Sequence, residues 1–465
     1  EVNYTKESLT ASNDCTAIFV RDKEEKTITI NSGITVTDFD GKKPLNINKG
    51  SAGTTVINNG SLIETRSTTV ILVGRNSTVE LFENNGTISG SKGIKMVNRT
   101  GAGANWGHIK VFTNTGTLKQ TRDIPDPTDD NAAIWLNVWG KITELNNSGS
   151  IRSSWQTINN FGIIENFNNT GTISTDKDDD GTVDNGKAIV NARDTETPAS
   201  WYADQSFDKR KIGTLTNSGT IEATVNTIHN TGLIETINNS GNITATGNRA
   251  IYNKNENDGR NYGEIDTLIN SGTISAGSHA IHNTGTITTI TNTGTIESTG
   301  SGYSIKNEGV ITNLTNSKGA SGSTLTYTGT VPTNYNIIIN SASDFGKIAF
   351  TSITGSLNFN VDSESELAGG TTYSSIMTGI SSGSISGQSG SHLNTSTGDR
   401  FEWSLENGGD ATTWNLVTET PQSITPPTNC SIDSSLPGCT SDDEDIVSTI
   451  ELGMNNLTNL SLIHI

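Results

Sequence analysis

Aliphatic residues recur along the chain at fixed distances from Asn and Gly. The shared unit is Ile-x-x-Φ-x-Asn-x-Gly-x-Ile, where Φ is Leu, Phe or Ile. Copies start at Val79, Ile109, Ile142, Ile164, Ile212, Ile234, Ile265 and Ile287, and degenerate copies are centred on Val56 and start at Ile311. A second half-unit lies between many copies, as in "AIHNTGTI" at Ala280, and the basic period is 22 residues, as from Ile265 to Ile287. Self-similarity at such a period predicts a solenoid.

The residue types in this repeat favour strands over helices. Ile, Thr, Val and Asn, with Gly at the corners, have poor helix propensity and suit short strands. We therefore predict an all-β, right-handed parallel β-helix of about 22 residues per coil, with coils stacked about 4.8 Å apart. We expect the recurring Asn side chains to hydrogen-bond from coil to coil. We also expect these Asn residues in left-handed turns, with the Gly two positions later in a second unusual backbone conformation.

Changes in the repeat divide the chain into four parts. Residues 1–50 are expected to form N-terminal cap strands, and residues 51–323 to form the β-helix with loop insertions. The repeat stops near Thr324, so residues 324–420 are expected to form a β-rich C-terminal cap that protects the open end of the solenoid. The larger core residues expected in this region are Trp403, Trp414, Phe359 and Tyr373. Residues 421–465 have the composition of a linker.

Three cysteines add little to this division. Cys430 and Cys439 bracket the short segment "CSIDSSLPGC" in the linker. In an oxidising compartment they would close a small disulfide, and the alternative is two inert thiols. Cys15 has no evident partner in the sequence.

The composition suits a rod and excludes some partners. Apolar residues make up 31% of the 465 residues, which is low for one large globular core. A coil that buries only about four aliphatic side chains needs no more than that. The net charge is −19, which argues against nucleic acid as a partner because phosphate binding draws on Lys and Arg. No apolar run approaches the roughly 20 residues of a membrane-spanning helix.

The order of segments resembles a known family. "NSGTI" and "NTGTI" coils precede a β-rich segment containing "GKIAF", "GGTTYSSI" and "WSLENGGDATTWNLV", and the linker follows. Over about residues 50–420 the chain resembles the passenger domain of a bacterial autotransporter (type V secretion). Its Asn-x-Gly-rich style is similar to ε-proteobacterial members of the Campylobacter and Helicobacter type, and residues 324–420 are similar to that family's autochaperone segment. The resemblance implies a location at the bacterial cell surface (outer membrane) or secretion. It also implies a membrane link only through a C-terminal β-barrel, which is absent here and toward which residues 421–465 would lead.

The resemblance also implies a class of function. Family passengers range over adhesins, toxins and proteases. We expect an adhesin or other host-interaction (virulence) protein that binds a host cell-surface glycan or protein, without catalysis and without a required cofactor. Two alternatives stay open: a polysaccharide-active β-helix enzyme (lyase or hydrolase), and a structural surface protein that self-associates between cells.

Two acidic insertions extend one corner of the predicted solenoid. They lie between Leu118 and Ile134 and between Ile173 and Ile189. The second places carboxylates on alternate residues around a Gly, as at the start of a calcium loop, with Asp176, Asp178, Asp180 and Asp184 as predicted Ca²⁺ ligands. Lys187 stands where an EF-hand has its bidentate Glu, so a last ligand would come from Asp126, Asp129 or Asp130 on the neighbouring insertion. The alternative is a solvated acidic loop.

Insertions at the other corner carry aromatic residues. They follow Ile94, Ile134, Ile189 and Ile251, and their predicted binding residues are Trp106, Trp139, Trp201, Tyr202 and Tyr262. Aromatic side chains along one edge of a rod would form a platform for sugar rings or for a protein partner. The alternative is that they fold back and cover the coils beneath their own loops.

The remaining candidate groups give little sign of a catalytic or metal site. His229 and His282 occupy equivalent positions two coils apart, about 9.6 Å, which is too far to share a metal ion, so we expect them to be surface residues. Outward carboxylates recur at Glu80, Glu165 and Glu235, a pattern more typical of a solvated face than of a glycosidase pair. The chain has no GxSxG, GDSGG, HExxH or P-loop motif.

Overall fold

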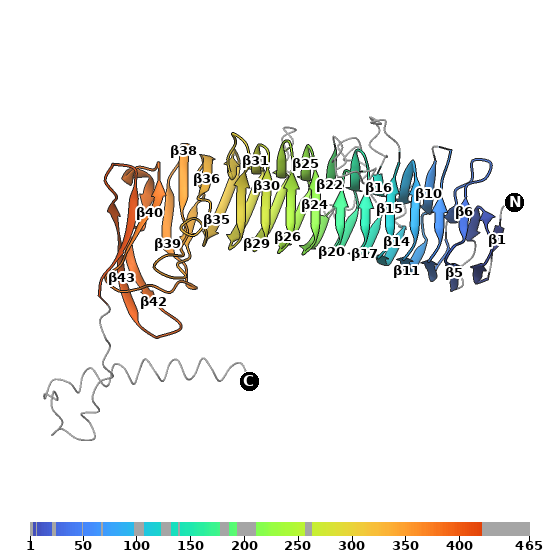
Figure 1. The fold of residues 1–465 in the computed structure, drawn as a ribbon, viewed down its shortest axis with the longest axis horizontal. Helices are drawn as coiled ribbons and strands as arrows, with labels where there is room; N and C mark the ends of the chain where they lie inside the picture. Colours follow the sequence, from blue (N-terminus) through green and yellow to red (C-terminus); the bar gives the residue numbers. More distant parts are fainter. Residues whose placement is uncertain are drawn as a thin grey trace, which may run out of the picture.

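The computed structural model describes a long stack of β-strand coils that ends in a group of antiparallel strands (Figure 1). It describes residues 3–5, 7–20, 25–48, 50–66, 68–96, 107–121, 132–137, 140–176, 186–192, 211–255 and 263–420. The N-terminus lies at one end of the stack and the antiparallel strands lie at the other. Among these residues, no helix has the length and apolar character needed to cross a membrane.

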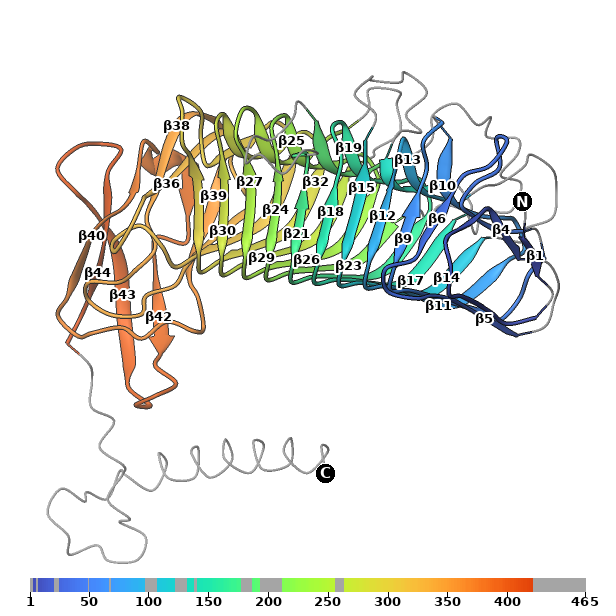
Figure 2. The same ribbon diagram turned by 45° about the vertical axis from the view of Figure 1, so that its right-hand side comes forward.

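Three sheets of 18, 15 and 11 strands, called A, B and C here, run side by side along the stack (Figure 2). Along the regular part of the chain the order is one strand of B, one of C and one of A, as in β32, β33 and β34. Each strand there pairs in parallel with its equivalent one coil away. This arrangement confirms the predicted parallel β-helix.

The strands of sheet B are the longest of the repeat. They are β2 (Leu9–Ala11), β5 (Lys26–Ile30), β8 (Thr54–Asn58), β11 (Thr78–Asn84), β14 (His108–Asn114), β17 (Lys141–Asn147), β20 (Ile163–Asn169), β23 (Lys211–Asn217), β26 (Leu233–Asn239), β29 (Glu264–Asn270), β32 (Thr286–Asn292), β35 (Val310–Asn316), β37 (Asn334–Ile337), β39 (Leu357–Val361) and β41 (Ile385–Ser386). Those of sheet C are β3 (Cys15–Thr16), β6 (Thr35–Thr37), β9 (Ser61–Ile63), β12 (Thr87–Gly90), β15 (Thr117–Gln120), β18 (Ser150–Arg152), β21 (Thr172–Ser174), β24 (Thr220–Ala223), β27 (Asn242–Ala245), β30 (Thr273–Ala276) and β33 (Thr295–Ser298).

The strands of sheet A include both parallel coil strands and the terminal antiparallel ones. The parallel strands are β1 (Asn3–Thr5), β4 (Ile18–Val20), β7 (Leu45–Ile47), β10 (Thr69–Val73), β13 (Lys92–Met96), β16 (Ala132–Leu136), β19 (Gln156–Asn160), β22 (Lys187–Asn191), β25 (Asn226–Asn230), β28 (Arg249–Asn253), β31 (His279–Asn283), β34 (Ile305–Asn307), β36 (Leu325–Thr330) and β38 (Ile348–Thr354). The terminal ones are β40 (Thr372–Thr378), β42 (Ser389–Leu393), β43 (Arg400–Asn407) and β44 (Trp414–Thr418), with a 3₁₀ turn at Ser382–Ser384.

Columns of aliphatic side chains fill the interior of the stack. Ile287 lies over Ile265 in sheet B, and Ile296 lies over Ile274 in sheet C. These side chains are buried, and so are their equivalents along the rod. Because each anchor packs against the same residue type one coil away, a thin core is enough, which accounts for the low apolar fraction.

A ladder of buried Asn side chains runs along the last position of the sheet B strands. Each Nδ2 donates to the Oδ1 of the Asn one coil further on, at 2.6 to 2.9 Å. The members are Asn58, Asn84, Asn114, Asn147, Asn169, Asn217, Asn239, Asn270, Asn292 and Asn316. The same amides also donate to backbone carbonyls of the next coil, as Asn217 does to Asn242. The predicted coil-to-coil hydrogen bonding is therefore confirmed.

A second ladder follows the last position of the sheet A strands. It joins Asn160, Asn191, Asn230, Asn253, Asn283 and Asn307 through Nδ2–Oδ1 distances of 2.7 to 2.8 Å. It begins later than the first, because Met96 and Leu136 hold the equivalent position in the preceding coils. The central and C-terminal coils are thus joined by two buried amide columns.

The Gly of the repeat is required by steric contact, and the predicted left-handed conformation is wrong. Neither the ladder Asn residues nor the Gly residues two positions later have positive φ angles. The Asn residues end regular strands instead. A Cβ on Gly219 would lie 2.1 Å from the carbonyl oxygen of Gly171, and one on Gly241 would lie 2.2 Å from that of Gly219. Successive corners therefore stack with backbone against backbone, which only Gly allows.

The solenoid continues through both ends of the repeat region. In residues 1–50, β5 pairs in parallel with β8, and β4 pairs with β7, which pairs with β10. Beyond Thr324, β36 pairs in parallel with β34, and β37 with β35. Among the described strands, antiparallel pairs are made by β40, β42, β43 and β44 alone. Residues 421–465, with Cys430 and Cys439, lie outside the described residues.

Large side chains close the C-terminal end, as predicted. Phe359 and Tyr373 are fully buried, and Trp403 and Trp414 are nearly so. The rings of Phe359 and Trp403 meet edge to face with centroids 5.6 Å apart, and Trp414 Nε1 donates to the Ile380 carbonyl at 2.8 Å. Aromatic side chains thus supply much of the core at this end of the stack.

Removing an Asn from the middle of the sheet B ladder should lower the unfolding free energy more than removing the first Asn of the ladder. In Asn217→Ala, the amide of Asn169 loses its acceptor and the Oδ1 of Asn239 loses its donor. We expect a loss of about 3 kcal/mol in unfolding free energy, since each buried polar group without a partner costs roughly 1–3 kcal/mol. Guanidinium unfolding followed by circular dichroism measures the change.

Asn58→Ala is the matched control. Asn58 begins the ladder and faces Ile30 in the preceding coil, and its Oδ1 has no hydrogen-bond partner. Its removal deprives only Asn84 of a ladder neighbour, so we expect about half the loss of Asn217→Ala. Equal losses in the two variants would contradict a role for the coil-to-coil bonds.

Candidate functional site

The insertions lie at the two ends of the parallel strands of sheet A. Residues 97–106, 193–210 and 256–262 follow β13, β22 and β28, and residues 122–131 and 177–185 precede β16 and β22. The predicted binding residues Trp106, Trp139, Trp201, Tyr202 and Tyr262 lie outside the described residues. Strands β13, β16, β22 and β28, which the insertions follow or precede, all belong to sheet A, so the outward face of sheet A is the candidate binding surface.

One column of outward side chains runs the length of this face. In each strand, the residue of this column lies between the buried Ile column and the last strand position. Because successive side chains of a strand point to opposite faces, this residue points away from the core. Its members, in register, are Phe19, Asn46, Leu72, Lys95, Trp135, Asn159, Val190, His229, Tyr252, His282, Lys306, Thr328 and Thr351. No Asp or Glu occupies this column, although the chain as a whole carries a net charge of −19.

Aromatic rings stack along the column over β25, β28 and β31. The centroids of His229 and Tyr252 are 5.2 Å apart, and those of Tyr252 and His282 are 5.0 Å apart. His279 meets His282 edge to face at 5.6 Å and stacks on Tyr303 at 6.0 Å. We call these five residues the ring stack. They are partly exposed except for His282, which is buried.

Arg249 fixes the hydrogen bonding of the ring stack. Its Cζ lies 4.4 Å from the centre of the Tyr252 ring, and its Nε donates to His282 Nδ1 at 2.7 Å. Nδ1 of a neutral imidazole can accept only when Nε2 carries the proton. Nε2 therefore donates to Glu308 Oε2, 2.8 Å away, and Glu308 also pairs with Lys306 at 2.9 Å.

The imidazoles of the ring stack are held neutral. Burial, followed by the charges of Lys187, Lys254 and Arg249, lowers the pKa of His229 to about 3. Burial and neighbouring positive groups lower the pKa of His279 to about 4. Burial also lowers the pKa of His282, and the hydrogen bond that His282 donates to Glu308 opposes this shift. Uncharged rings can pack at van der Waals distance without repelling one another.

The expectation that both His229 and His282 are surface residues is therefore wrong for His282. Only 4% of His282 is exposed, because Tyr252, His279 and Arg249 surround it. The predicted spacing of two coils is correct, and Tyr252 lies between the two histidines. In the described part of the chain, no three His, Cys, Asp or Glu side chains are grouped so that they could hold a metal ion.

Sequence reasoning missed most of this site. The sequence feature that could have indicated the site is the third residue of the segments "AIWL", "TIHN", "AIYN", "AIHN" and "SIKN", which is often aromatic or basic. In three dimensions those residues form the outward column, including Trp135, whose ring lies 4.4 Å from Lys95 Nζ.

Cys15 is free and half-buried in β3, and burial followed by the charge of Asp14 raises the pKa of its thiol.

Of the predicted calcium ligands, only Asp176 lies among the described residues. It follows β21, is buried, and has its Oδ2 3.9 Å from Arg152 Nη1. Glu222 is a nearby carboxylate, and its pKa is raised by burial and then by the charge of Asp176. Asp178, Asp180 and Asp184 lie outside the described residues, as do Asp126, Asp129 and Asp130.

Three outward carboxylates of sheet B, at equivalent positions of the repeat, are paired with lysines. Glu80 Oε2 lies 2.6 Å from Lys110 Nζ, and Glu165 Oε1 lies 2.6 Å from Lys141 Nζ. Glu235 pairs with Lys211 in the same manner. Each lysine comes from a neighbouring coil, so these carboxylates form part of a solvated, charge-balanced face.

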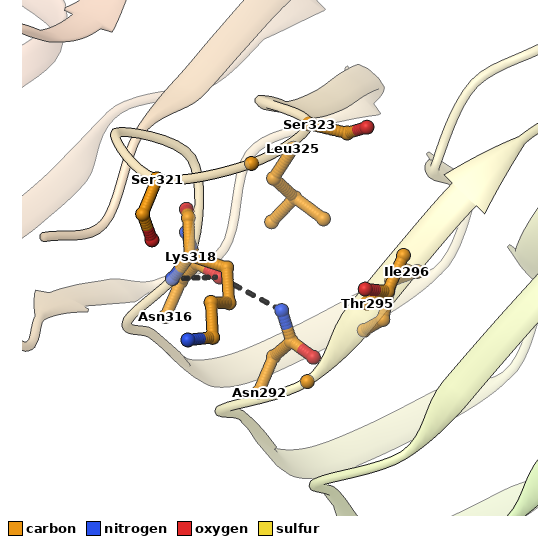
Figure 3. Close-up of a pocket in the computed structure, with 10 residues that line it drawn as sticks. Asn292, Thr295, Ile296, Asn316, Lys318, Ser321, Ser323 and Leu325 are labelled. Atoms are coloured by element: carbon orange, nitrogen blue, oxygen red, sulfur yellow. Dashed lines mark hydrogen bonds between the residues drawn. The ribbon is translucent and has the colours of Figure 1, made fainter. Parts of the chain in front are cut away.

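A small hollow lies where sheet C ends, beyond β33 (Figure 3). Asn292, Thr295, Lys318, Ser321, Ser323 and Leu325 line it. There the sheet B ladder ends, because Asn316 Nδ2 donates to the carbonyls of Lys318 and Lys347. Its volume is about 160 Å³, below the roughly 300–1,000 Å³ of usual ligand pockets. The ring stack is therefore the stronger candidate site.

Comparisons of the chain with protein-family models, with curated proteins and with solved structures find no match.

Replacing His229 should reduce the loss of stability in acid. The folded-state pKa of about 3 lies below the ordinary value of 6.5. The unfolded chain therefore takes up a proton first, and stability is lost as the pH falls from 6.5 toward 3. We expect His229→Asn to lose about 2 kcal/mol less unfolding free energy than wild type between pH 7.5 and pH 5.

Guanidinium unfolding at the two pH values measures this difference. Val190→Ala, in the same column one coil away, is the control and should keep the wild-type pH dependence. If His229→Asn and wild type lost the same unfolding free energy between pH 7.5 and pH 5, the pKa of His229 would not be lowered in the folded state.

Proposed function

We propose that the protein is a surface-displayed or secreted autotransporter passenger that acts as an adhesin or other host-interaction protein. The outward face of sheet A and the insertions at its two ends would form the binding surface. The observation that carries the proposal is the ring stack with Arg249 on this face, because aromatic and Arg side chains dominate binding hot spots.

The placement of the insertions gives further support. Loops at both ends of the sheet A strands would border the same outward column that holds Trp135, Tyr252 and His282. Binding residues are commonly carried by loops that a rigid scaffold positions. The predicted loop aromatics, Trp139 and Trp201 among them, would add to the platform.

The two alternatives have less support. For a polysaccharide-active enzyme, the recurrent carboxylates Glu80, Glu165 and Glu235 are the obvious candidates, and each pairs with a lysine. A glycosidase needs two carboxylates facing one bond, one of them with a raised pKa. Glu222 beside Asp176 and Asp266 beside Glu235 have a raised pKa, with burial as its first cause, and a basic residue, Arg152 or Lys211, opposes each shift. For self-association, two rods would pair along their polar faces, and on sheet B the carboxylates of Glu80 and Glu165 already pair with lysines of the same chain.

Cell attachment tests the proposed function. Tyr252→Ala and the double variant Trp139→Ala/Trp201→Ala should each weaken attachment of the fluorescently labelled protein to cultured host cells by about tenfold, a typical hot-spot effect. Lys110→Ala, on sheet B, is the control and should attach like wild type. Circular dichroism verifies that every variant is folded. Undiminished attachment of both aromatic variants would count against binding through this surface.

Calcium binding to the acidic insertion is a separate proposal. Ca²⁺ prefers several carboxylate and carbonyl oxygens, and the insertion offers Asp178, Asp180 and Asp184 beside the buried Asp176. Calorimetric titration at near-physiological salt should give a binding isotherm that is lost in Asp178→Asn/Asp180→Asn. Glu83→Gln, on sheet B, should leave the isotherm unchanged. A flat titration of the wild-type protein would remove this proposal.

A further inference from the structure

We propose that the ring stack and its charged neighbours bind an acidic polysaccharide lying along the rod. Arg249 would pair with the carboxylate or sulfate groups, Lys306, which also pairs with Glu308, would add positive charge, and the polar edges of Tyr252 and His279 would face sugar hydroxyls. This inference rests on the proposed function, since it names the ligand of the same surface. It is carried by the geometry and charge of β25, β28, β31 and β34.

Arg249 has bonding capacity left for an anion. Its Nε is used by His282, and no described carboxylate forms an ion pair with it. The two terminal nitrogens of a guanidinium form a planar fork that matches a carboxylate or a sulfate. Because the Tyr252 ring and His282 hold it from two sides, little side-chain entropy remains to be lost on binding.

The rings present edges to a ligand. Tyr252 and His282 are stacked with an interplanar angle of 23°, and His279 and Tyr303 with one of 12°. Rings stacked in this way cover each other's faces, so polar ring atoms and hydroxyls are what a ligand can reach. Such edges suit hydrogen bonding to sugar hydroxyls better than they suit an apolar contact.

The charges on the outward face of sheet A favour an acidic ligand. The outward column has no carboxylate, and neither does the parallel row formed by Gln156, Lys187, Asn226, Arg249 and His279. Glu308 lies beside the column, where it is bonded to His282 and Lys306 and leaves Arg249 unpaired. Arg249 and Lys306 lie two coils apart, about 10 Å along the rod. A polymer with repeated negative charges can meet both, whereas a single small anion meets only one.

The lack of exposed apolar groups favours a glycan over a protein partner. Protein hot spots are anchored by large side chains that enter desolvated pockets. The exposed large apolar residues of the described chain are Phe39, Ile269, Val310 and Leu393, and none lies on β25, β28, β31 or β34.

Binding of defined polymers to the immobilised full chain tests the inference. The probes are heparin as the sulfated polymer, polygalacturonate as the carboxylated polymer and dextran as the neutral polymer. We expect at least one acidic polymer to bind, dextran to bind at least tenfold more weakly, and the binding to weaken from 0.05 M to 0.5 M salt, since exposed charges are screened. The acidic polymer with the higher affinity identifies the preferred group.

Matched variants locate the site. Arg249→Gln should weaken binding about tenfold, and Arg249→Lys, which keeps the charge but loses the fork, should weaken it less. Lys110→Gln removes a cation from sheet B and should change binding less than twofold. Circular dichroism confirms that the variants are folded.

The outcomes separate this inference from the proposed function. Equal binding of dextran, or binding unaffected by Arg249→Gln, would overturn the inference. Cell attachment that persists without binding to either acidic polymer would also overturn it and leave the proposed function standing. Binding to an acidic polymer without attachment to any host cell would support the inference and contradict the adhesin function.

Discussion

The hydrogen bond from one buried Asn amide to the next is the interaction on which the rest of the structure depends. Columns of Ile and Leu fill the interior, but apolar contacts alone fix register weakly because they have no direction. A buried amide that slipped against its neighbour would lose its partner at a cost of roughly 1–3 kcal/mol. Asn169, Asn217 and Asn239 each have such partners on both sides, so the sheet B strands have one favoured alignment. The same alignment brings Gly171 and Gly219 into backbone contact at the next corner.

The second ladder connects this constraint to the candidate site. Its members Asn230, Asn253 and Asn283 directly follow His229, Tyr252 and His282 in the same strands. Because the amides hold the three strands in register from inside, the three rings outside lie one above another at about 5 Å. Coils before Asn160 lack this ladder. The ring stack therefore lies over coils joined by two amide columns.

The sequence predicted what repeats and missed what depends on neighbouring coils. The spacing of Ile, Asn and Gly predicted the parallel β-helix and the Asn ladder because both follow from one coil copied many times. The Gly conformation was wrong because Asn-x-Gly is typical of a turn, while here Gly219 is needed for contact with Gly171. The burial of His282 was missed because its cover comes from Tyr252 and His279. Beyond Thr324 the strands still pair in parallel with the preceding coil but have larger core side chains. The solenoid therefore continues past the last recognisable copy of the sequence repeat.

All three sheets stack their coil strands in parallel, so the side chains largely determine the chemistry of each face of the rod. On sheet B, carboxylates such as Glu80 and Glu165 alternate with the lysines that neutralise them. On sheet A, the outward column excludes carboxylates, and Arg249 lies against neutral rings. A net charge of −19 makes a partner with the same sign unfavourable over most of the surface. An outward column without carboxylates therefore restricts where an acidic ligand can approach, and the insertions join the chain at the two ends of strands that carry this column.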